Sequence, residues 1–290
     1  MPSDPANRRP PNQAALGSSF DLPEPEFEII RQMVKSKTGI SLGLHKRDLV
    51  VSRLARRLRS LGLESFREYI DLLRGDQDGG ELVHMINRIT TNKTDFFREP
   101  KHFEYMESTV LPAIKAAGIR RLRAWSAGCS TGAEAYTMAM VFDDFAMRNG
   151  GPEYGILATD LDSDVLEAAR RGIYPRALLD PTPAAMRKRY VMEPVDRRSG
   201  DVRIVPALRS AIGFAQLNFM DANYPVGNPM DIILCRNVLI YFDRPTQEAV
   251  LGRLCRNLKP GGWIMLGHSE TIADMQLPLR QVGFTTFQKV

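Results

Sequence analysis

The sequence predicts an α/β fold in which a doubly wound, mostly parallel β-sheet has helices on both faces and is preceded by a small all-α domain. Three observations predict this fold. Apolar residues follow a helical period alone from Glu26 to Ile89, short β-rich runs alternate with helical patterns after Lys101, and a glycine-bearing turn follows the first of those runs. At 290 residues the chain has room for one large domain and one smaller one.

The helical domain is expected to span residues 23–89, where apolar side chains recur at helical spacing in four stretches. These stretches run from Phe27 to Val34, from Val50 to Leu61, from Phe66 to Leu73 and from Leu82 to Ile89. Residues 1–22 are rich in Pro, Asn, Ser and Arg, a composition that predicts a disordered tail. Residues 90–100 are predicted to be a linker out of the helical domain.

Residues 101–290 are expected to form the sheet domain. Its β-rich runs are Leu122–Ser126, Tyr154–Thr159, Ile212–Leu217, Asp231–Leu234 and Trp263–Leu266. We expect Lys259–Gly262 to form a turn before the last run, and residues 189–206 to form a small inserted antiparallel hairpin. Phe284–Val290 is expected to add an antiparallel strand at the sheet edge.

The composition is that of a globular protein, with 43% apolar and 25% charged residues. No apolar run approaches the roughly 18 residues needed to cross a bilayer, and residues 1–12 lack the apolar stretch of a signal peptide. Three well-separated cysteines, Cys129, Cys235 and Cys255, fit neither a disulfide framework nor a zinc site. These features predict a cytoplasmic protein without membrane insertion.

The net charge of +5 is concentrated in one helix-sized segment. Between Lys46 and Arg59, six basic residues and one acidic residue give 6 − 1 = +5, the whole excess. The side chains that lie opposite the apolar face or flank it include Arg53, Arg56, Arg57 and Arg59. A patch of one sign predicts one acidic partner surface and no nucleic acid, with an ordinary solvated face as the alternative.

The first β-rich run leads into a turn, Gly128–Gly132, and then into a helix. Such a turn lets a ligand lie against bare backbone at the carboxyl edge of a parallel sheet, although two glycines can also simply form a tight turn. Glu134 in the first helical turn disfavours a pyrophosphate at this helix N-terminus. It suits a ligand with a cationic centre, such as S-adenosylmethionine.

Polar side chains end the next three strands. Asp160 follows the second strand, where its carboxylate can accept both hydroxyls of a ribose. Capping the next helix is the alternative role, for which Asp162 or Ser163 is better placed. Asn218 and Asn237 follow the third and fourth strands, where each can bind an adenine or an amino acid group, or else bond its own loop. Polar residues at four strand ends together predict one ligand site.

Neither a metal nor a reactive thiol is predicted. The four histidines have no metal-ligand spacing; they are His45, His84, His102 and His268. Cys235, at a strand end, is most simply a small buried apolar residue.

Four segments together carry a resemblance to a known family. They are Arg88–Arg98, Gly128–Gly132, Cys235–Phe242 and Leu266–Glu270. Over residues 25–290 the chain resembles the CheR-type chemotaxis receptor methyltransferases. The resemblance implies a Rossmann-like class I methyltransferase domain that uses S-adenosyl-L-methionine, releases S-adenosyl-L-homocysteine and esterifies glutamate side chains on the cytoplasmic helices of bacterial chemoreceptors.

The resemblance also implies site residues. Those implied to contact the methyl donor are Asn92, Thr94, Arg98, Glu134, Asp160, Asn218, Phe219, Arg236 and Asn237. Arg98 and Tyr241 are implied to be the active-site pair, which would make the linker at residues 90–100 part of the active site. The chain departs from the common pattern at Ala133, Ala135 and Phe219, and at residues 194–196 of the inserted hairpin.

Glutamate methylation needs no general base, because a carboxylate with a pKa near 4.3 is already an anion at neutral pH. What remains is in-line approach to the methyl group and removal of water from the attacking oxygen. Arg98 can orient either the substrate carboxylate or the donor carboxylate, and the Tyr241 hydroxyl can hold either partner. The alternative role of Tyr241 is a core aromatic beside Phe242.

The partner that the basic segment predicts is an acidic helix of a chemoreceptor, since receptor methylation helices are rich in glutamate. The side chains expected to bind it are Arg53, Arg56, Arg57 and Arg59. Two other functions stay open. One is methylation of nucleic acid, for which the basic segment lacks stacking aromatics. The other is a signalling module that binds the donor without transferring methyl.

Overall fold

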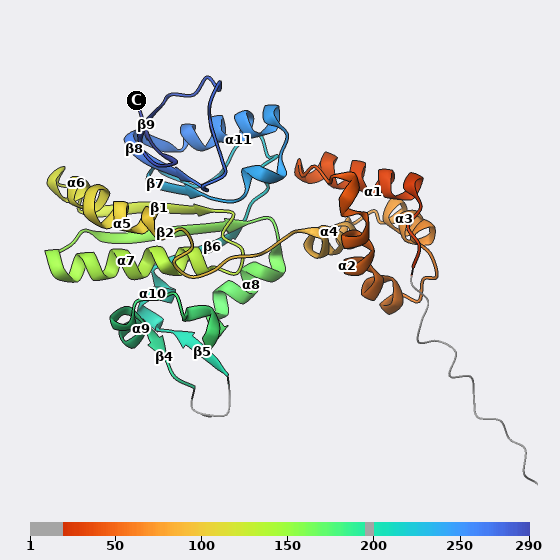
Figure 1. The fold of residues 1–290 in the computed structure, drawn as a ribbon, viewed down its shortest axis with the longest axis horizontal. Coiled ribbons are helices and arrows are strands. Elements are labelled where there is room, and N and C mark those ends of the chain that lie inside the picture. The colour runs from red at the N-terminus through yellow and green to blue at the C-terminus, as the bar shows by residue number, and fades with distance from the viewer. Residues whose placement is uncertain (1–19, 195–199) are drawn as a thin grey trace, which may run out of the picture. The chain divides into compact units, whose positions relative to one another are not determined.

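The computed structural model describes residues 20–194 and 200–290, and these fall into two compact units (Figure 1). The first unit contains the described residues up to Ile30 together with Gly43–Ile89, and the second contains Arg31–Leu42 and Thr90–Val290. Most of the expected tail, and residues 195–199 of the expected hairpin, lie outside the described ranges. In those ranges, no helix combines the length and apolar character needed to cross a bilayer.

The first unit is helical, with the four helices that the sequence predicts. They are α1 (Glu24–Thr38, which continues into the second unit), α2 (Arg47–Ser60, preceded by the 3-10 turn η1, Leu44–Lys46), α3 (Phe66–Gly75) and α4 (Gly80–Ile89). The predicted apolar faces are buried; Leu54, for example, is fully inaccessible. Leu22 is also fully buried, and the Phe20 ring packs edge-on against Phe66. Packed sequence therefore begins before the tail boundary expected at residue 22.

The second unit is built on a seven-stranded sheet of order β6-β2-β1-β7-β8-β10-β9. The first five strands in this order are parallel, and β10 is antiparallel to both β8 and β9. Their bounds are β1 Arg121–Ala127, β2 Glu153–Asp160, β6 Ile212–Gln216, β7 Met230–Cys235, β8 Leu258–Leu266, β9 Leu279–Gly283 and β10 Thr286–Lys289. The doubly wound α/β prediction is confirmed.

Two details of the sheet differ from the prediction. The last strand does not form the edge, because the unpredicted β9 pairs with its outer side. Residues 259–262 do not precede β8 but lie within it: Met230 pairs with Leu258 and Ile232 with Trp263, so these residues bulge opposite Asp231. A bulge absorbs turn-forming residues without ending the strand.

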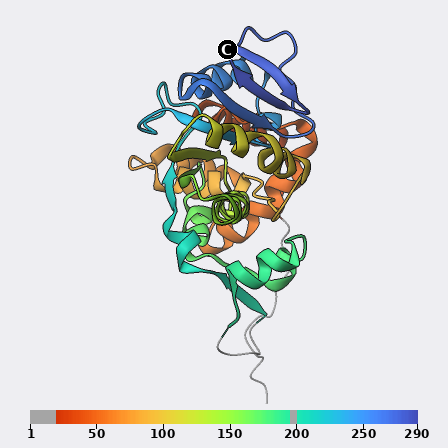
Figure 2. The same cartoon turned by 90° about the vertical axis from the view of Figure 1, so that its left-hand side faces the viewer.

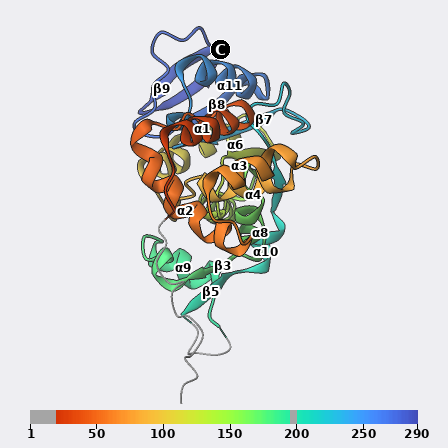
Figure 3. The same ribbon diagram turned by 90° about the vertical axis from the view of Figure 1, so that its right-hand side faces the viewer.

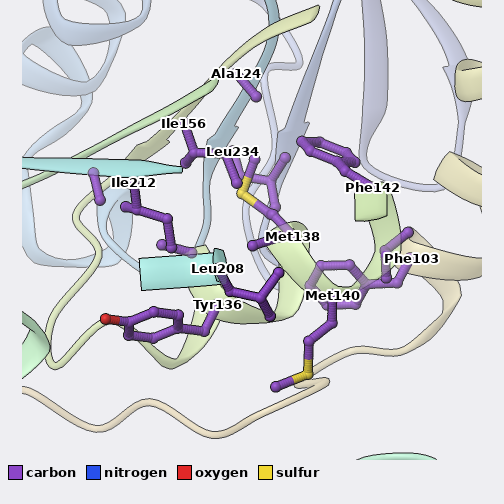
Figure 4. Close-up of a cluster of buried hydrophobic side chains, with 14 of the residues drawn as sticks. Phe103, Ala124, Tyr136, Met138, Met140, Phe142, Ile156, Leu208, Ile212 and Leu234 are labelled. Carbon is purple, nitrogen blue, oxygen red and sulfur yellow. The ribbon is translucent and has the colours of Figure 1, made fainter. Parts of the chain in front are cut away.

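Helices cover both faces of this sheet, as expected for a parallel sheet whose central strand β7 is buried at every position. Ala124, Ile156 and Leu234 share one core with side chains of α7, which Figure 4 shows in close-up. Trp125 and Ile233 point to the other face and pack with residues of α11. The helical elements of this unit are α5 (Lys101–Tyr105), η2 (Met106–Val110), α6 (Leu111–Ala116), α7 (Ala133–Asn149), α8 (Ser163–Arg171), η3 (Arg176–Leu179), α9 (Ala184–Tyr190), α10 (Pro206–Ser210), η4 (Leu239–Tyr241) and α11 (Arg244–Arg256).

A small antiparallel sheet is inserted between β2 and β6. Its order is β3-β5-β4, with β3 at Ile173–Pro175, β4 at Val191–Met192 and β5 at Asp201–Ile204. The predicted hairpin contains β4 and β5, whereas β3 was not predicted. Within this unit the small sheet lies at the end opposite the blue strands β8 to β10 (Figure 2), with α9 beside it (Figure 3).

Candidate active site

The turn Gly128–Gly132 lies at the point where the strand order reverses, since β1 has β2 on one side and β7 on the other. The backbone N–H groups of Gly128 and Cys129 donate to Thr159 O at 2.8 and 2.9 Å. Gly128 has φ +86°, and a Cβ there would lie 2.4 Å from Val238 Cγ2. Only glycine therefore lets this turn approach the loop after β7 so closely.

Asp160 is the last residue of β2 and faces this turn. Its Oδ2 accepts from Ser130 N at 2.8 Å and its Oδ1 from Asp162 N at 3.0 Å. Burial raises the pKa of Asp160. A carboxylate has about four acceptor positions, so capacity remains beyond these two bonds. The cap of α8 is Asp162, one of the two residues that the sequence offered for this role, and it accepts from Asp164 N at 2.9 Å and Val165 N at 3.3 Å.

The segment after α4 runs along the same edge of the sheet. Asn92 Nδ2 donates to Asp162 Oδ2 at 2.7 Å, and Asn92 O accepts from Ser130 Oγ at 2.8 Å. Thr94 and Arg98 are half-buried, and Arg98 Nη1 donates to Lys93 O at 3.0 Å. This segment therefore lies beside the glycine turn within the second unit.

Arg236, the residue after β7, is a buried cation between two carboxylates. Its guanidinium lies 3.3 Å from Glu99 Oε2 and 3.6 Å from Glu134 Oε2, and it donates to Arg98 O. Burial raises the pKa of Glu134. Burial also acts to raise the pKa of Glu99, but the hydrogen bond from Asn237 and the charge of Arg236 outweigh it, so that pKa is lowered. Arg236 thus lies near the expected donor site, and its guanidinium already has partners inside the protein.

Glu270 organises the loop after β7. Its buried carboxylate accepts from the backbone N–H of Asn237 at 3.0 Å, Val238 at 2.9 Å, Leu239 at 2.8 Å and Gly267 at 2.6 Å. Asn237 is left-handed there, with φ +59°. The segment Leu266–Glu270 is part of the family resemblance in the sequence, but no role for Glu270 or for Glu99 was predicted from it.

Asn218 and Phe219 follow β6, whose neighbour Leu217 donates to Asp160 O at 3.0 Å. The Asn218 amide donates to Lys37 O at 2.6 Å and accepts from Met220 N at 2.9 Å, so both of its ends bind backbone. Phe219 is 9% exposed and packs in the hydrophobic core between the sheet and α11. Tyr241 is half-buried in η4, where its carbonyl accepts from Ser41 N at 2.8 Å.

The basic residues of α2 belong to the first unit and differ in their surroundings. Arg57 binds Glu81 through two contacts, Nε–Oε1 at 3.0 Å and Nη2–Oε2 at 2.5 Å. Arg53 donates to Ile89 O at 2.5 Å. Arg56 and Arg59 are exposed. Arg53 and Arg57 are therefore already hydrogen-bonded inside the helical unit, and the Arg59 guanidinium lies over the Phe20 ring, 5.8 Å from its centroid.

Two of the four histidines lie close together in the fold although they are far apart in the sequence. His102 and His268 lie near Glu99 in the second unit. Burial, followed by the charge of Arg236, lowers the pKa of His102 to about 4, so its ring is neutral at pH 7. The predicted burial of Cys235 is confirmed, and burial raises the pKa of that thiol well above its ordinary value.

Comparison with known families covers nearly the whole described chain. The model for the "CheR methyltransferase, SAM binding domain" matches residues 92–288, and that for the "CheR methyltransferase, all-alpha domain" matches residues 25–90. Together these ranges contain both the carboxyl edge of the sheet and the helical unit.

Two relatives are similar to this chain over more than nine tenths of their own length. The chain is 38% identical to "Chemotaxis protein methyltransferase 2" of Pseudomonas aeruginosa, covering 96% of this chain and 97% of the relative. It is 40% identical to "Chemotaxis protein methyltransferase" of Escherichia coli, covering 92% and 91%. Among solved structures, the glycopeptide N-methyltransferase MtfA with bound (S)-adenosyl-L-methionine has a TM-score of 0.36 at 13% identity, covering 66% of this chain and 57% of that one. From the family models and these relatives, the chain belongs to the CheR methyltransferase family and is an S-adenosyl-L-methionine-dependent methyltransferase.

Proposed function

We propose that the protein transfers the methyl group of S-adenosyl-L-methionine to glutamate side chains of bacterial chemoreceptors, forming glutamyl methyl esters on the cytoplasmic side. The observation that carries this proposal is the polar network at the carboxyl edge of the sheet. It lies within the residues matched by the SAM-binding family model and joins Asp160, Glu134, Arg236 and Asn237 to the segment with Asn92.

In this proposal the donor lies against the Gly128–Gly132 turn, with its ribose hydroxyls on Asp160. The remaining acceptor capacity of that carboxylate and its place beside the turn support this position. Glu134 supplies negative charge near a cationic sulfonium, and Asn237 offers an amide from the neighbouring strand end. The donor-binding set is Asn92, Thr94, Arg98, Glu134, Asp160, Asn218, Phe219, Arg236 and Asn237, of which Phe219 acts through apolar contact because it is buried.

The chemical step is one of positioning. The glutamate nucleophile is an anion at neutral pH, so the enzyme has to align it with the methyl group and exclude water from the attacking oxygen. Arg98 donates one of its N–H groups to Lys93 O, and its other donors can orient a carboxylate. The Tyr241 hydroxyl would hold the donor or the incoming side chain.

For the substrate we propose an acidic receptor helix that binds α2. The exposed side chains of Arg56 and Arg59 support this role directly. Arg53 and Arg57 already bind groups inside the helical unit, so they would attract the acidic helix mainly through their electrostatic field and not through direct contacts.

A transfer assay with radiolabelled S-adenosyl-L-methionine and receptor-containing membranes tests the proposal. Label that alkali releases as methanol is the expected result, because glutamyl esters hydrolyse at high pH. Label that stays on nucleic acid would support the alternative methyltransferase instead. Donor binding without any transfer would identify a non-catalytic module, and either outcome would overturn the proposal.

A further inference from the structure

Two histidines and a glutamate from distant parts of the sequence meet beside the candidate active site. Glu99, His102 and His268 each offer a ligand atom within 4.8 Å of the other two. Glu99 Oε2 lies 3.6 Å from His102 Nδ1 and 3.8 Å from His268 Nε2. Atoms bound to one metal at about 2.1 Å lie roughly 3 to 4 Å from each other, so these separations are close to those of a metal site.

Two of these atoms are buried without a hydrogen-bond partner. In the described part of the chain, neither Glu99 Oε2 nor His102 Nδ1 has a hydrogen bond, and the His102 side chain is only 2% exposed. Their separation is too long for a hydrogen bond to each other. Buried polar atoms are rarely left unsatisfied, because their desolvation is not compensated. A cation between them would satisfy both.

The outer contacts are those that metal ligands usually have. The other ring nitrogen of His102, Nε2, lies 2.9 Å from Thr285 Oγ1 and 3.3 Å from Phe284 O. When Nε2 carries the proton, Nδ1 is left as a lone-pair donor. Glu99 Oε1 accepts from Asn237 Nδ2 at 3.1 Å and from His268 N at 3.3 Å, whereas Oε2 accepts no hydrogen bond and has only the ion-pair contact with Arg236 and the two imidazoles beside it in the described residues. Such outer contacts orient ligands and raise metal affinity.

Arg236 is the competing charge, since its guanidinium lies 3.3 Å from Glu99 Oε2. It has other partners, however: it donates to Arg98 O and lies 3.6 Å from Glu134 Oε2. With Glu99 and Glu134 both near one guanidinium, this pair of carboxylates is not fully neutralised by Arg236. A dication can therefore bind Glu99 while Arg236 keeps its remaining contacts.

We propose that Glu99 Oε2, His102 Nδ1 and His268 Nε2 form a binding site for a borderline divalent cation of the Zn²⁺ type. Two imidazoles with one carboxylate suit Zn²⁺ or Co²⁺ better than Mg²⁺ or Ca²⁺, which prefer oxygen ligands. The His268 side chain is 37% exposed, so solvent can supply a further ligand. Because Glu99 also accepts a hydrogen bond from Asn237, a metal ion bound to Glu99 would be linked through it to the candidate active site. The proposal does not depend on the proposed function.

Metal titration of the full-length, tag-free protein tests the proposal. After treatment with a chelator, the protein is titrated with Co²⁺ and visible absorption is followed, since four- or five-coordinate Co²⁺ absorbs far more strongly than the hydrated ion. The expected result is saturation at one equivalent and displacement by Zn²⁺ but not by Mg²⁺. Absence of saturable binding would overturn the proposal.

Variants assign the site to these residues. His268→Ala, at a partly exposed position, is expected to weaken Co²⁺ binding by at least about tenfold, and Thr285→Val, which keeps all three ligands but removes the outer partner of His102, by about tenfold. His84→Ala, at an exposed position on α4, is the matched control and is expected to bind as the wild type does. Circular dichroism verifies folding. Wild-type affinity in both His268→Ala and Thr285→Val would contradict the assignment.

Discussion

At the scale of single residues, buried carboxylates hold the backbone of the candidate site. Glu270 accepts four backbone N–H groups, three from residues 237–239 and one from Gly267, and so joins the end of β8 to the loop that carries Asn237 and Tyr241. Asp160 joins the glycine turn to the start of α8 in the same way. Positioning by such groups suits a reaction that needs alignment rather than acid–base catalysis.

Glu270→Gln is expected to lower the free energy of unfolding by about 1 to 3 kcal/mol, because the new NH₂ group faces backbone donors that need acceptors. The rate of methyl transfer should fall as well, because the loop with Asn237 would no longer be held in place by Glu270. Denaturant unfolding and the transfer assay measure both effects. Glu167→Gln, an exposed carboxylate on α8, is the control, and equal stability of the two variants would contradict the role given to Glu270.

Asp160→Asn is expected to weaken S-adenosyl-L-methionine binding by about 1.5 to 3 kcal/mol, roughly ten- to a hundredfold, because charge-assisted hydrogen bonds to the ribose are lost. Isothermal titration calorimetry measures this change. Asp164→Asn alters an exposed carboxylate four residues further along and should bind normally. Unchanged affinity in Asp160→Asn would place the ribose elsewhere.

Some of these residue roles could be read from the sequence and others could not. The cap of α8 was predictable because an Asp N-cap binds N–H groups two and three residues away. Glu99 and Asn237 are separated by 138 positions, and no local pattern signals their hydrogen bond. The cluster of His102 and His268 was missed for the same reason, because sequence spacing reports only ligands that lie on one local element.

At the scale of elements, the start of α11 is tied to the last turns of α1 and to the segment that follows α1. Asp243 caps α11 by accepting from Thr246 N at 3.2 Å, and its carboxylate lies 3.0 Å from Lys35 Nζ. Next to it, Ile40 forms an antiparallel bridge with Phe242. Asp243, two residues after Tyr241 in the chain, therefore fixes the start of α11.

Asp243→Ala should lower the free energy of unfolding by about 1 kcal/mol at pH 7, the usual contribution of an N-cap. The hydrogen bond with Thr246 and the contact with Lys35 lower the pKa of Asp243 to about 2. A lowered pKa stabilises the folded state above the ordinary value, so the difference from wild type should shrink as pH falls from about 4 towards about 2. Denaturant unfolding at each pH measures it, with Asp221→Ala as an exposed control. A difference that stays constant over this range would contradict the ionised cap.

The exposed charge of α2 is expected to act on substrate and not on donor. Arg56→Glu combined with Arg59→Glu should reduce kcat/KM for receptor membranes by about tenfold or more at low salt, with a smaller loss at high salt and an unchanged Kd for S-adenosyl-L-methionine. Arg67→Glu, an exposed residue of α3, is the matched charge reversal. Arg57 is unsuitable for this test, because its loss would leave Glu81 without its partner. Equal losses in the double variant and in Arg67→Glu would contradict a specific docking role.

Strands were predictable where burial is continuous and less so at the margin of the sheet. β7 is buried at every position, and its apolar run was plain in the sequence. β9 has no fully buried residue, so its pattern resembles that of a loop. β3 is three residues long and pairs only with the inserted strand β5, which leaves no periodicity to recognise.

At the scale of the whole molecule, alternation of strands and helices was enough to predict the fold class, because parallel strands require crossover helices. The division into units was harder to predict. α1 reads as one continuous amphipathic helix, yet residues from Arg31 to Leu42 belong with the sheet. Contacts such as Lys37 O with Asn218 Nδ2 explain this, and they join residues 181 positions apart.

A crystal structure of the protein with S-adenosyl-L-homocysteine is the most direct test of the proposed donor site. We expect the nucleoside to lie at the carboxyl edge of the parallel strands, with both ribose hydroxyls on Asp160 and its sulfur facing the space near Arg98 and Tyr241. A nucleoside bound away from this edge, or one whose ribose does not touch Asp160, would rule out the proposed donor site.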